Sequence, residues 1–152
     1  MDQARTKARK VIPVKIGHLW VILDADVVQE IVGARAWVPV PQSSPLVPGV
    51  LAWRGRAVAV FDLSVLAHAG APLRPGVERP RTLIVQSKGC VLAMPVDIVR
   101  EVQEVDASLL RAAHVTSMQH SSLEADVFGA PAPVLDLGSV VSALLEASVG
   151  GA

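Results

Sequence analysis

Two short sequences recur along the chain in the same order and at nearly the same interval. Val60 to Ser64 returns 74 positions later as Val134 to Gly138, and Asp26 to Ile31 returns 71 positions later as Asp97 to Val102. Two recurrences in one order indicate an internal duplication, the alternative being a chance resemblance between strands. We therefore expect two similar subdomains that pack on each other, because neither alone would bury much core.

Residues Gly49 to Leu63 carry the pattern of a β-hairpin. Two runs rich in Val and Ala flank Arg54-Gly55, and Gly55 can supply the positive φ that a tight turn needs. The second run is apolar enough to be a core strand. Arg54 is therefore expected at an exposed tip.

The rest of the chain predicts further short strands and one helix. Apolar runs of strand length lie at 11–23, 27–32, 82–86, 91–94, 96–105 and 133–137. The proline-rich residues 38–49 indicate an extended surface connection, and residues 70–81 indicate a boundary between subdomains. After Ser139, which can cap a terminal helix, one apolar face is formed by Val140, Val141, Leu144 and Leu145. The predicted class is mainly β, with turn spacings suited to small barrels.

Composition limits the classes of function that the chain can serve. The 152 residues are 51% hydrophobic, which supplies ample core for one domain or two small subdomains. With 14 basic and 14 acidic residues, the chain has no net positive charge to attract nucleic acid. It has no Tyr and few Trp or Phe, so it also lacks the aromatic side chains on which bases stack. Residues 1–10 are basic and predict a disordered tail rather than a secretion signal. The lone Cys90 fits a reducing, cytoplasmic compartment, and we expect no membrane insertion.

No catalytic, cofactor or metal pattern is present in the sequence. A nucleophile elbow and a glycine-rich phosphate loop are both missing. His114 and His120 could be imagined around zinc with Cys90, but no zinc-type spacing accompanies them. Asp62 and Asp136 occupy equivalent positions of the repeat, where an aspartate that caps the following turn is the simplest explanation. We therefore expect a protein that is not an enzyme and binds no cofactor.

Several of these segments together resemble a known family, the CheW-like domain. They are Ile31-Val32-Gly33, the proline-rich connection, Gly49-Val50, Arg54-Gly55, Val60 to Leu63, and Val96 to Val102, and they cover about residues 11–148. The resemblance implies two interlocked five-stranded SH3-like β-barrel subdomains, roughly residues 11–78 and 81–148. It also implies a non-catalytic adaptor of cytoplasmic chemosensory arrays, joining the tip of a chemoreceptor to a CheA-type histidine kinase.

The resemblance further implies a receptor-binding groove. By position, its residues in this chain are Val28, Glu30, Gly49, Val50 and Arg54. A receptor tip is an antiparallel helical hairpin, so an adaptor needs an apolar shelf and a few charges that fix the register. Val28 and Val50 are expected to form the shelf, and Glu30 and Arg54 to supply the charges.

The first hairpin departs from the family pattern, and these departures keep alternatives open. Ala52-Trp53-Arg54-Gly55 stands where the family usually has Asn-Leu-Arg-Gly, the Val-Pro pair after the turn is missing, and Ser64 replaces an Arg. One alternative is an accessory member that binds receptors and organises clusters without kinase coupling. The others are a small β-barrel that binds a ligand or acts as an enzyme, and a barrel that binds nucleic acid.

Overall fold

Strands dominate the computed structural model, which describes residues 8–112 and 118–150. In chain order they are β1 (Ala8–Ile16), β2 (Leu19–Asp24), β3 (Val28–Gly33), β4 (Val38–Pro39), β5 (Gly49–Trp53), β6 (Arg56–Val60), β7 (Arg81–Ser87), β8 (Cys90–Val96), β9 (Ile98–Val99), β10 (Gln103–Asp106), β11 (Arg111–Ala112), β12 (Leu123–Val127) and β13 (Ala130–Pro133). The helices are α1 (Leu63–Ala67), α2 (Leu137–Gly150) and the 3-10 helices η2 (Ala25–Val27) and η3 (Ala107–Leu109). The expected mainly β class with a C-terminal helix is confirmed.

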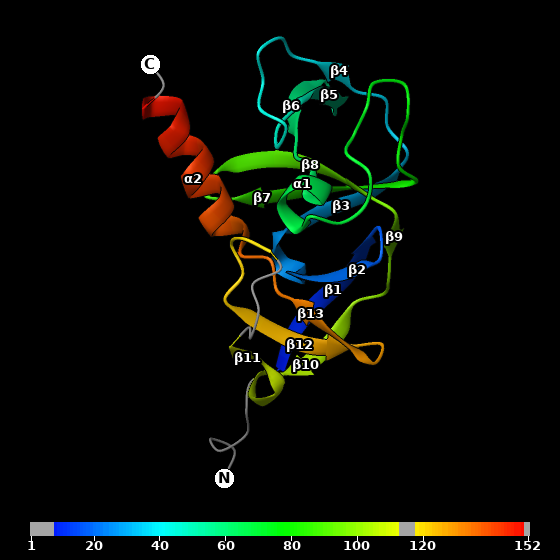
Figure 1. The fold of residues 1–152 in the computed structure, drawn as a ribbon, viewed down its shortest axis with the longest axis vertical. Helices are drawn as coiled ribbons and strands as arrows, with labels where there is room; N and C mark the ends of the chain where they lie inside the picture. The colour runs from blue at the N-terminus through cyan, green and yellow to red at the C-terminus, as the bar shows by residue number, and fades with distance from the viewer. Residues whose placement is uncertain (1–7, 113–117, 151–152) are drawn as a thin grey trace.

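Strand pairing exchanges a hairpin between the two halves of the chain. β7 and β8 join the strands of the first half in a six-stranded sheet of order β3-β7-β8-β6-β5-β4. β1 pairs with β2, β9 and β10, and β2 meets the β13 end through a parallel bridge between Ile22 and Val134. Figure 1 shows the result, with β3 to β8 in the upper part and β1, β2 and β10 to β13 in the lower. Each part of the fold therefore takes strands from both halves of the chain, and the division into subdomains at residues 11–78 and 81–148 stays a prediction.

The expected closed barrels are not found among the described strands. No ladder joins β3 to β5, and β11, β12 and β13 form a three-stranded sheet of their own. In the upper part, only two parallel residue pairs join β6 to β8. In the lower part, a single parallel bridge at Ile22 joins β2 to the end of β13. The sheets therefore curve without closing.

The first of the two sequence recurrences corresponds to repeated structure. β6 leads through Asp62 into α1, and β13 leads into α2 with Asp136 before its first residue. The Asp62 carboxylate accepts a hydrogen bond from Ser64 N at 3.1 Å, and the Asp136 carboxylate accepts one from Ser139 N at 3.0 Å. Both aspartates therefore cap helices, as their equivalent positions predicted. Ser139 is not the cap of α2, because the helix already begins at Leu137.

The other recurrence does not correspond to repeated structure. Asp26 lies inside η2, whereas Asp97 lies between β8 and β9. The structural equivalents are instead Asp24 and Asp106, which end β2 and β10 and precede the two 3-10 helices. Their backbones agree closely, with φ and ψ of −64° and 133° at Asp24 and −64° and 131° at Asp106.

Apolar side chains on both faces of the exchanged hairpin explain its uninterrupted sequence. Along β7, Leu83 and Val85 belong to the main apolar cluster, which also holds residues of α1, α2, β1 and β2. Ile84 belongs to a separate cluster with Trp37 and other buried residues of β5 and β6. A strand buried on both faces needs a continuous apolar run, and each such side chain contributes about 1.5–3 kcal/mol.

Both ends of the chain differ in detail from expectation. β1 begins at Ala8 and its first residues pair with β10, so Ala8 to Lys10 are strand rather than part of a disordered tail. Residues 1–7 lie outside the described residues. In α2, Val140 and Val141 are buried, but Leu145 is half exposed and does not belong to the buried face.

A buried ion pair that was not expected from the sequence fixes the loop between α1 and β7. Arg79 donates to the Asp62 carboxylate at 2.9 Å and to the backbone oxygens of Ala71 at 2.7 Å and Pro95 at 2.9 Å. The Asp62 carboxylate also accepts from Leu73 N at 2.8 Å. Only 9% of the Arg79 side chain and 2% of the Asp62 side chain are exposed. Asp62 therefore holds a helix cap, a loop and a buried cation together.

The two equivalent aspartates allow a matched test of this interaction. Asp62→Ala removes the cap and leaves the Arg79 guanidinium buried without its partner, so we expect the free energy of unfolding to fall by about 3–5 kcal/mol. Asp136→Ala removes an exposed cap alone and should cost about 1 kcal/mol. Urea unfolding of both variants measures the difference. Equal losses would show that the buried ion pair adds nothing beyond capping.

Candidate functional site

The structure brings together the two charges that were predicted from different strands. Glu30 lies on β3 and Arg54 in the turn between β5 and β6, and their side chains form an ion pair at 3.1 Å. Trp53 Nε1 donates to the same Glu30 oxygen at 3.0 Å. The Arg54 guanidinium lies over the Trp53 ring, 4.8 Å from its centroid. These side chains thus link two strands that share no ladder and lie far apart in the order of one curved sheet.

The turn at the end of this hairpin determines where Arg54 points. Trp53 pairs with Arg56 across a two-residue turn, in which φ is 51° at Arg54 and 74° at Gly55. Positive φ at both central residues is the arrangement that matches the twist of a hairpin. The expected positive φ at Gly55 is confirmed. The Arg54 side chain is 68% exposed, so the tip is exposed as expected.

The two valines expected to form an apolar shelf are only half exposed. Val28 pairs with Val85 and packs against the main apolar cluster, and a bulge separates it from Glu30. Val50 pairs with Val38 on one side and Ala59 on the other. The more exposed apolar surface at this edge is Val38 itself, with 64% of its surface accessible. Sequence reasoning passed over Val38 because it lies in the proline-rich connection.

Gly49 is buried beneath this surface. A Cβ atom at Gly49 would lie 2.1 Å from the Val38 carbonyl oxygen and 2.6 Å from the Trp37 ring. The glycine therefore lets Trp37 and β4 approach β5 closely. Neither Trp37 nor Trp53 was singled out as a site residue, although a tryptophan beside the Arg-Gly turn is the signal that could have identified Trp53.

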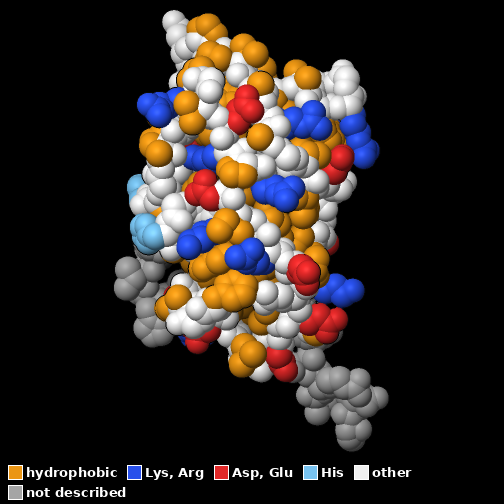
Figure 2. Space-filling view, turned by 90° about the vertical axis from the view of Figure 1, so that its right-hand side faces the viewer, with side chains coloured by type: hydrophobic (Ala, Val, Ile, Leu, Met, Phe, Trp, Pro, Cys, Tyr) orange, Lys and Arg blue, Asp and Glu red, His pale blue; other side chains and the backbone are white. Residues whose placement is uncertain are grey.

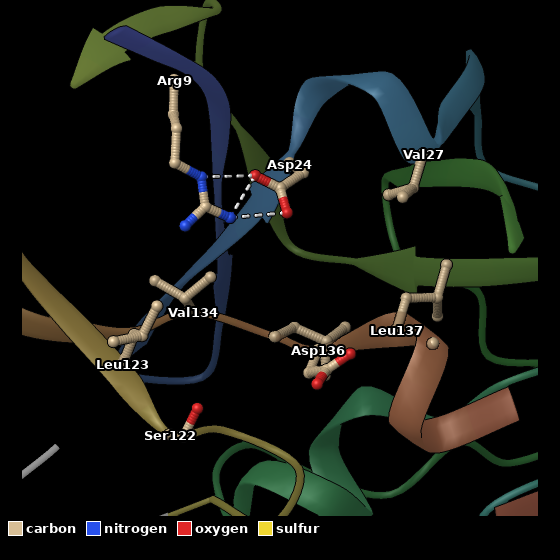
Figure 3. Close-up of a pocket in the computed structure, with 10 residues that line it drawn as sticks. Arg9, Asp24, Val27, Ser122, Leu123, Val134, Asp136 and Leu137 are labelled. Carbon is tan, nitrogen blue, oxygen red and sulfur yellow. Dashed lines mark hydrogen bonds and ion pairs between the residues drawn. The ribbon is translucent and has the colours of Figure 1, made fainter. Parts of the chain in front are cut away.

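A separate cavity of about 270 Å³ lies at the start of α2. Figure 3 shows Arg9 and Asp24 on one side of it and Val134, Asp136 and Leu137 on the other. The Arg9 guanidinium donates to both oxygens of Asp24, at 2.6 and 2.7 Å. None of the five predicted site residues lines this cavity.

The described residues contain no group of three His, Cys, Asp or Glu side chains placed to hold a metal ion. His120 Nδ1 lies 2.7 Å from Ser139 Oγ, and Cys90 is a half-buried free thiol. His114 lies outside the described residues. Within the described part of the chain, no helix combines the length and the apolar character that crossing a membrane requires.

Substitution of Gly49 tests its packing role. Gly49→Ala should lower the free energy of unfolding by about 1–3 kcal/mol, because the methyl group meets backbone and an aromatic ring that cannot both move away. Gly33→Ala is the control, since nothing lies within 4 Å of a Cβ at that strand position. We expect it to stay within about 0.5 kcal/mol of the unsubstituted protein. Thermal or urea unfolding that ranks the two variants equally would contradict this role.

The Glu30 and Arg54 contacts should contribute little to folding. Arg54→Ala removes an exposed ion pair and a ring contact, so the free energy of unfolding should fall by no more than about 1 kcal/mol. Circular dichroism during urea titration measures this. A larger loss would mean that the tip supports the fold and is not free to serve binding.

Comparison with known proteins agrees with the sequence resemblance and the observed architecture. The family model of the CheW-like domain matches residues 10–144. Among solved structures, the scaffolding protein TtCheW from Thermoanaerobacter tengcongensis has the same fold, with a TM-score of 0.74 and 21% sequence identity over 86% of this chain and 90% of that chain. No curated protein matches the chain. The chain belongs to the CheW-like domain family, the adaptor and scaffold proteins of chemotaxis signalling.

Proposed function

We propose that this protein is a non-catalytic adaptor that binds the cytoplasmic tip of a chemoreceptor and couples it to a CheA-type histidine kinase. Its place in the cell would then be the cytoplasmic chemoreceptor array. The observation that carries the receptor-binding part is the Glu30, Trp53 and Arg54 cluster, in which a charge on β3 meets a charge in the β5–β6 turn at an exposed tip. Two curved, barrel-like parts would act as rigid supports for such a surface.

The chemistry of this cluster suits a helical partner. An exposed helical hairpin presents apolar side chains flanked by charged ones, and the tip offers an indole face, a guanidinium and a carboxylate within one small area. Val38 and the partly buried Val50 add apolar surface elsewhere on the neighbouring strands β4 and β5. Gly49 contributes indirectly by allowing the close packing below, and Val28 by anchoring β3 against the core.

A second candidate function is receptor binding without kinase coupling. It is favoured by Trp53, which stands where the usual family pattern has Leu. The Trp53 indole donates a hydrogen bond to the Glu30 carboxylate, which a Leu could not do. A ligand-binding domain or enzyme has less support, because Arg9 and Asp24, the charged pair beside the cavity near α2, are engaged with each other.

Calorimetric titration separates these functions. The intact protein is titrated with the cytoplasmic signalling fragment of a receptor from its own organism and, separately, with the regulatory domain of the matching kinase. We expect binding of micromolar order at the receptor. Arg54→Ala and Glu30→Ala should weaken it about tenfold, because each removes a charge at the centre of the contact.

Arg56→Ala is the matched control, since Arg56 lies on the same hairpin, is exposed and has no ion pair among the described residues. It should leave the receptor affinity unchanged. Binding to both partners supports the coupler, and binding to the receptor alone supports the accessory adaptor. Failure of both titrations with folded partners would overturn the proposed function.

A further inference from the structure

Two aromatic rings and two cations form a surface cluster in the part of the molecule opposite to the Arg54 tip. Trp20 on β2 and Phe128 in the turn between β12 and β13 pack against each other in a tilted arrangement, with centroids 4.7 Å apart and an angle of 51° between the rings. Lys15 Nζ lies 5.5 Å and Arg100 Cζ 5.7 Å from the centroid of the Trp20 ring. We call Lys15, Trp20, Arg100 and Phe128 the cationic aromatic surface.

The elements that carry this surface face one side of the molecule. In Figure 1 the turns of the β1–β2 and β12–β13 hairpins and strand β9 lie on the right-hand side. Figure 2 looks onto that side and shows Lys and Arg side chains bordering a patch of hydrophobic side chains. Val102, directly before β10, is a further exposed apolar side chain of this part of the chain.

The internal repeat shows what is unusual about Phe128. Phe128-Gly129 occupies the same place in its hairpin as Arg54-Gly55 in the first, with φ of 51° at both Phe128 and Arg54. A bulky side chain at positive φ is strained, and 57% of Phe128 is exposed to water. Stability alone would favour Asn or Gly there. An exposed aromatic ring held in a strained conformation points to a role in binding.

The Arg54 tip and the cationic aromatic surface also differ in charge. At the first tip Arg54 is neutralised by Glu30. Lys15 and Arg100 have no ion pair among the described residues, and their contacts are with the Trp20 ring. The cationic aromatic surface therefore presents cations that a partner could neutralise.

Three carboxylates on the elements that carry or adjoin this surface, Glu124, Asp126 and Asp97, are engaged in other contacts. Arg111 pairs with Glu124 at 2.9 Å and with Asp126 at 2.8 Å, and the hydrogen bond to Asp126 is the main cause that raises the pKa of Arg111. Asp97 accepts a hydrogen bond from Gly17 N at 2.7 Å. Glu101 follows Arg100 and is exposed.

We propose that the cationic aromatic surface is a second docking site, which takes an acidic polypeptide segment with an apolar side chain between its carboxylates. The apolar side chain would pack on Trp20 and Phe128, and the carboxylates would pair with Lys15 and Arg100. Two cations are too few to neutralise the phosphates of a nucleic acid or to hold an anionic membrane. This site is built from other strands than the Glu30 and Arg54 cluster and does not depend on the function proposed for that cluster.

The test uses the full chain labelled with ¹⁵N and the synthetic peptide acetyl-Glu-Asp-Leu-Phe-Asp-Glu-amide. Resonances of the Trp20 indole, Arg100 and Phe128 should shift on titration, and those of Trp53 should not. Replacing Lys15 and Arg100 together by Glu should weaken binding about tenfold or more, because carboxylates would then face carboxylates. Phe128→Asn should weaken it as well without loss of stability, because Asn tolerates positive φ.

Two controls distinguish docking at this surface from binding at the Arg54 tip and from attraction by charge alone. Arg54→Ala should leave the peptide affinity unchanged, and a peptide with Ser-Ser in place of Leu-Phe should bind more weakly. Unchanged binding by the charge-reversed variant, equal binding of the Ser-Ser peptide, or shifts centred on Trp53 would overturn the proposal. So would tighter binding of phosphatidylserine vesicles or of an oligonucleotide at the same resonances.

Discussion

The exchange of the β7–β8 hairpin into the sheet of the first half is the constraint on which the rest of the structure depends. It places Leu83 and Val85 in one cluster and Ile84 in another, so a single strand joins two cores. The hairpin contacts the first-half strands on both sides, through the antiparallel pairing of β7 with β3 and a short parallel pairing of β8 with β6 in which Val60 lies opposite Ala93. Arg79, next to β7, ties the exchanged hairpin to Asp62 and thus to the end of β6. Neither half could keep its core if the other were removed.

Curvature of the six-stranded sheet brings together side chains from strands that are not neighbours in it. β3 and β5 lie apart in strand order, yet Glu30 reaches Trp53 and Arg54. The same hairpin geometry is used again in the second half, where Phe128 replaces the arginine. The two hairpins thus give the molecule two tips of different chemistry at equivalent turn positions.

Local patterns in the sequence were sufficient to predict the mainly β class, the turn at Gly55 and the caps at Asp62 and Asp136. Each of these features depends on residues close together in the chain. The strand exchange was beyond such patterns, since pairing of β6 with β8 depends on contacts distant in sequence. For the same reason the recurrence of Asp26 at Asp97 wrongly indicated repeated structure, and the buried ion pair of Arg79 was not predicted. The Glu30 and Arg54 positions came from the family resemblance, whereas Trp53 needed the structure.

The exchange also sets an order for folding during synthesis. β3 and β6 emerge early, but their sheet lacks its central strands until Val96 has left the ribosome. The apolar β1–β2 hairpin waits longer still, because its Ile22 meets Val134 near the end of the chain. Pairing between such distant segments is slow and leaves strand edges exposed to other chains in the meantime. An interlocked fold therefore keeps the strands of the nascent chain without their final partners until most of the chain has been synthesised.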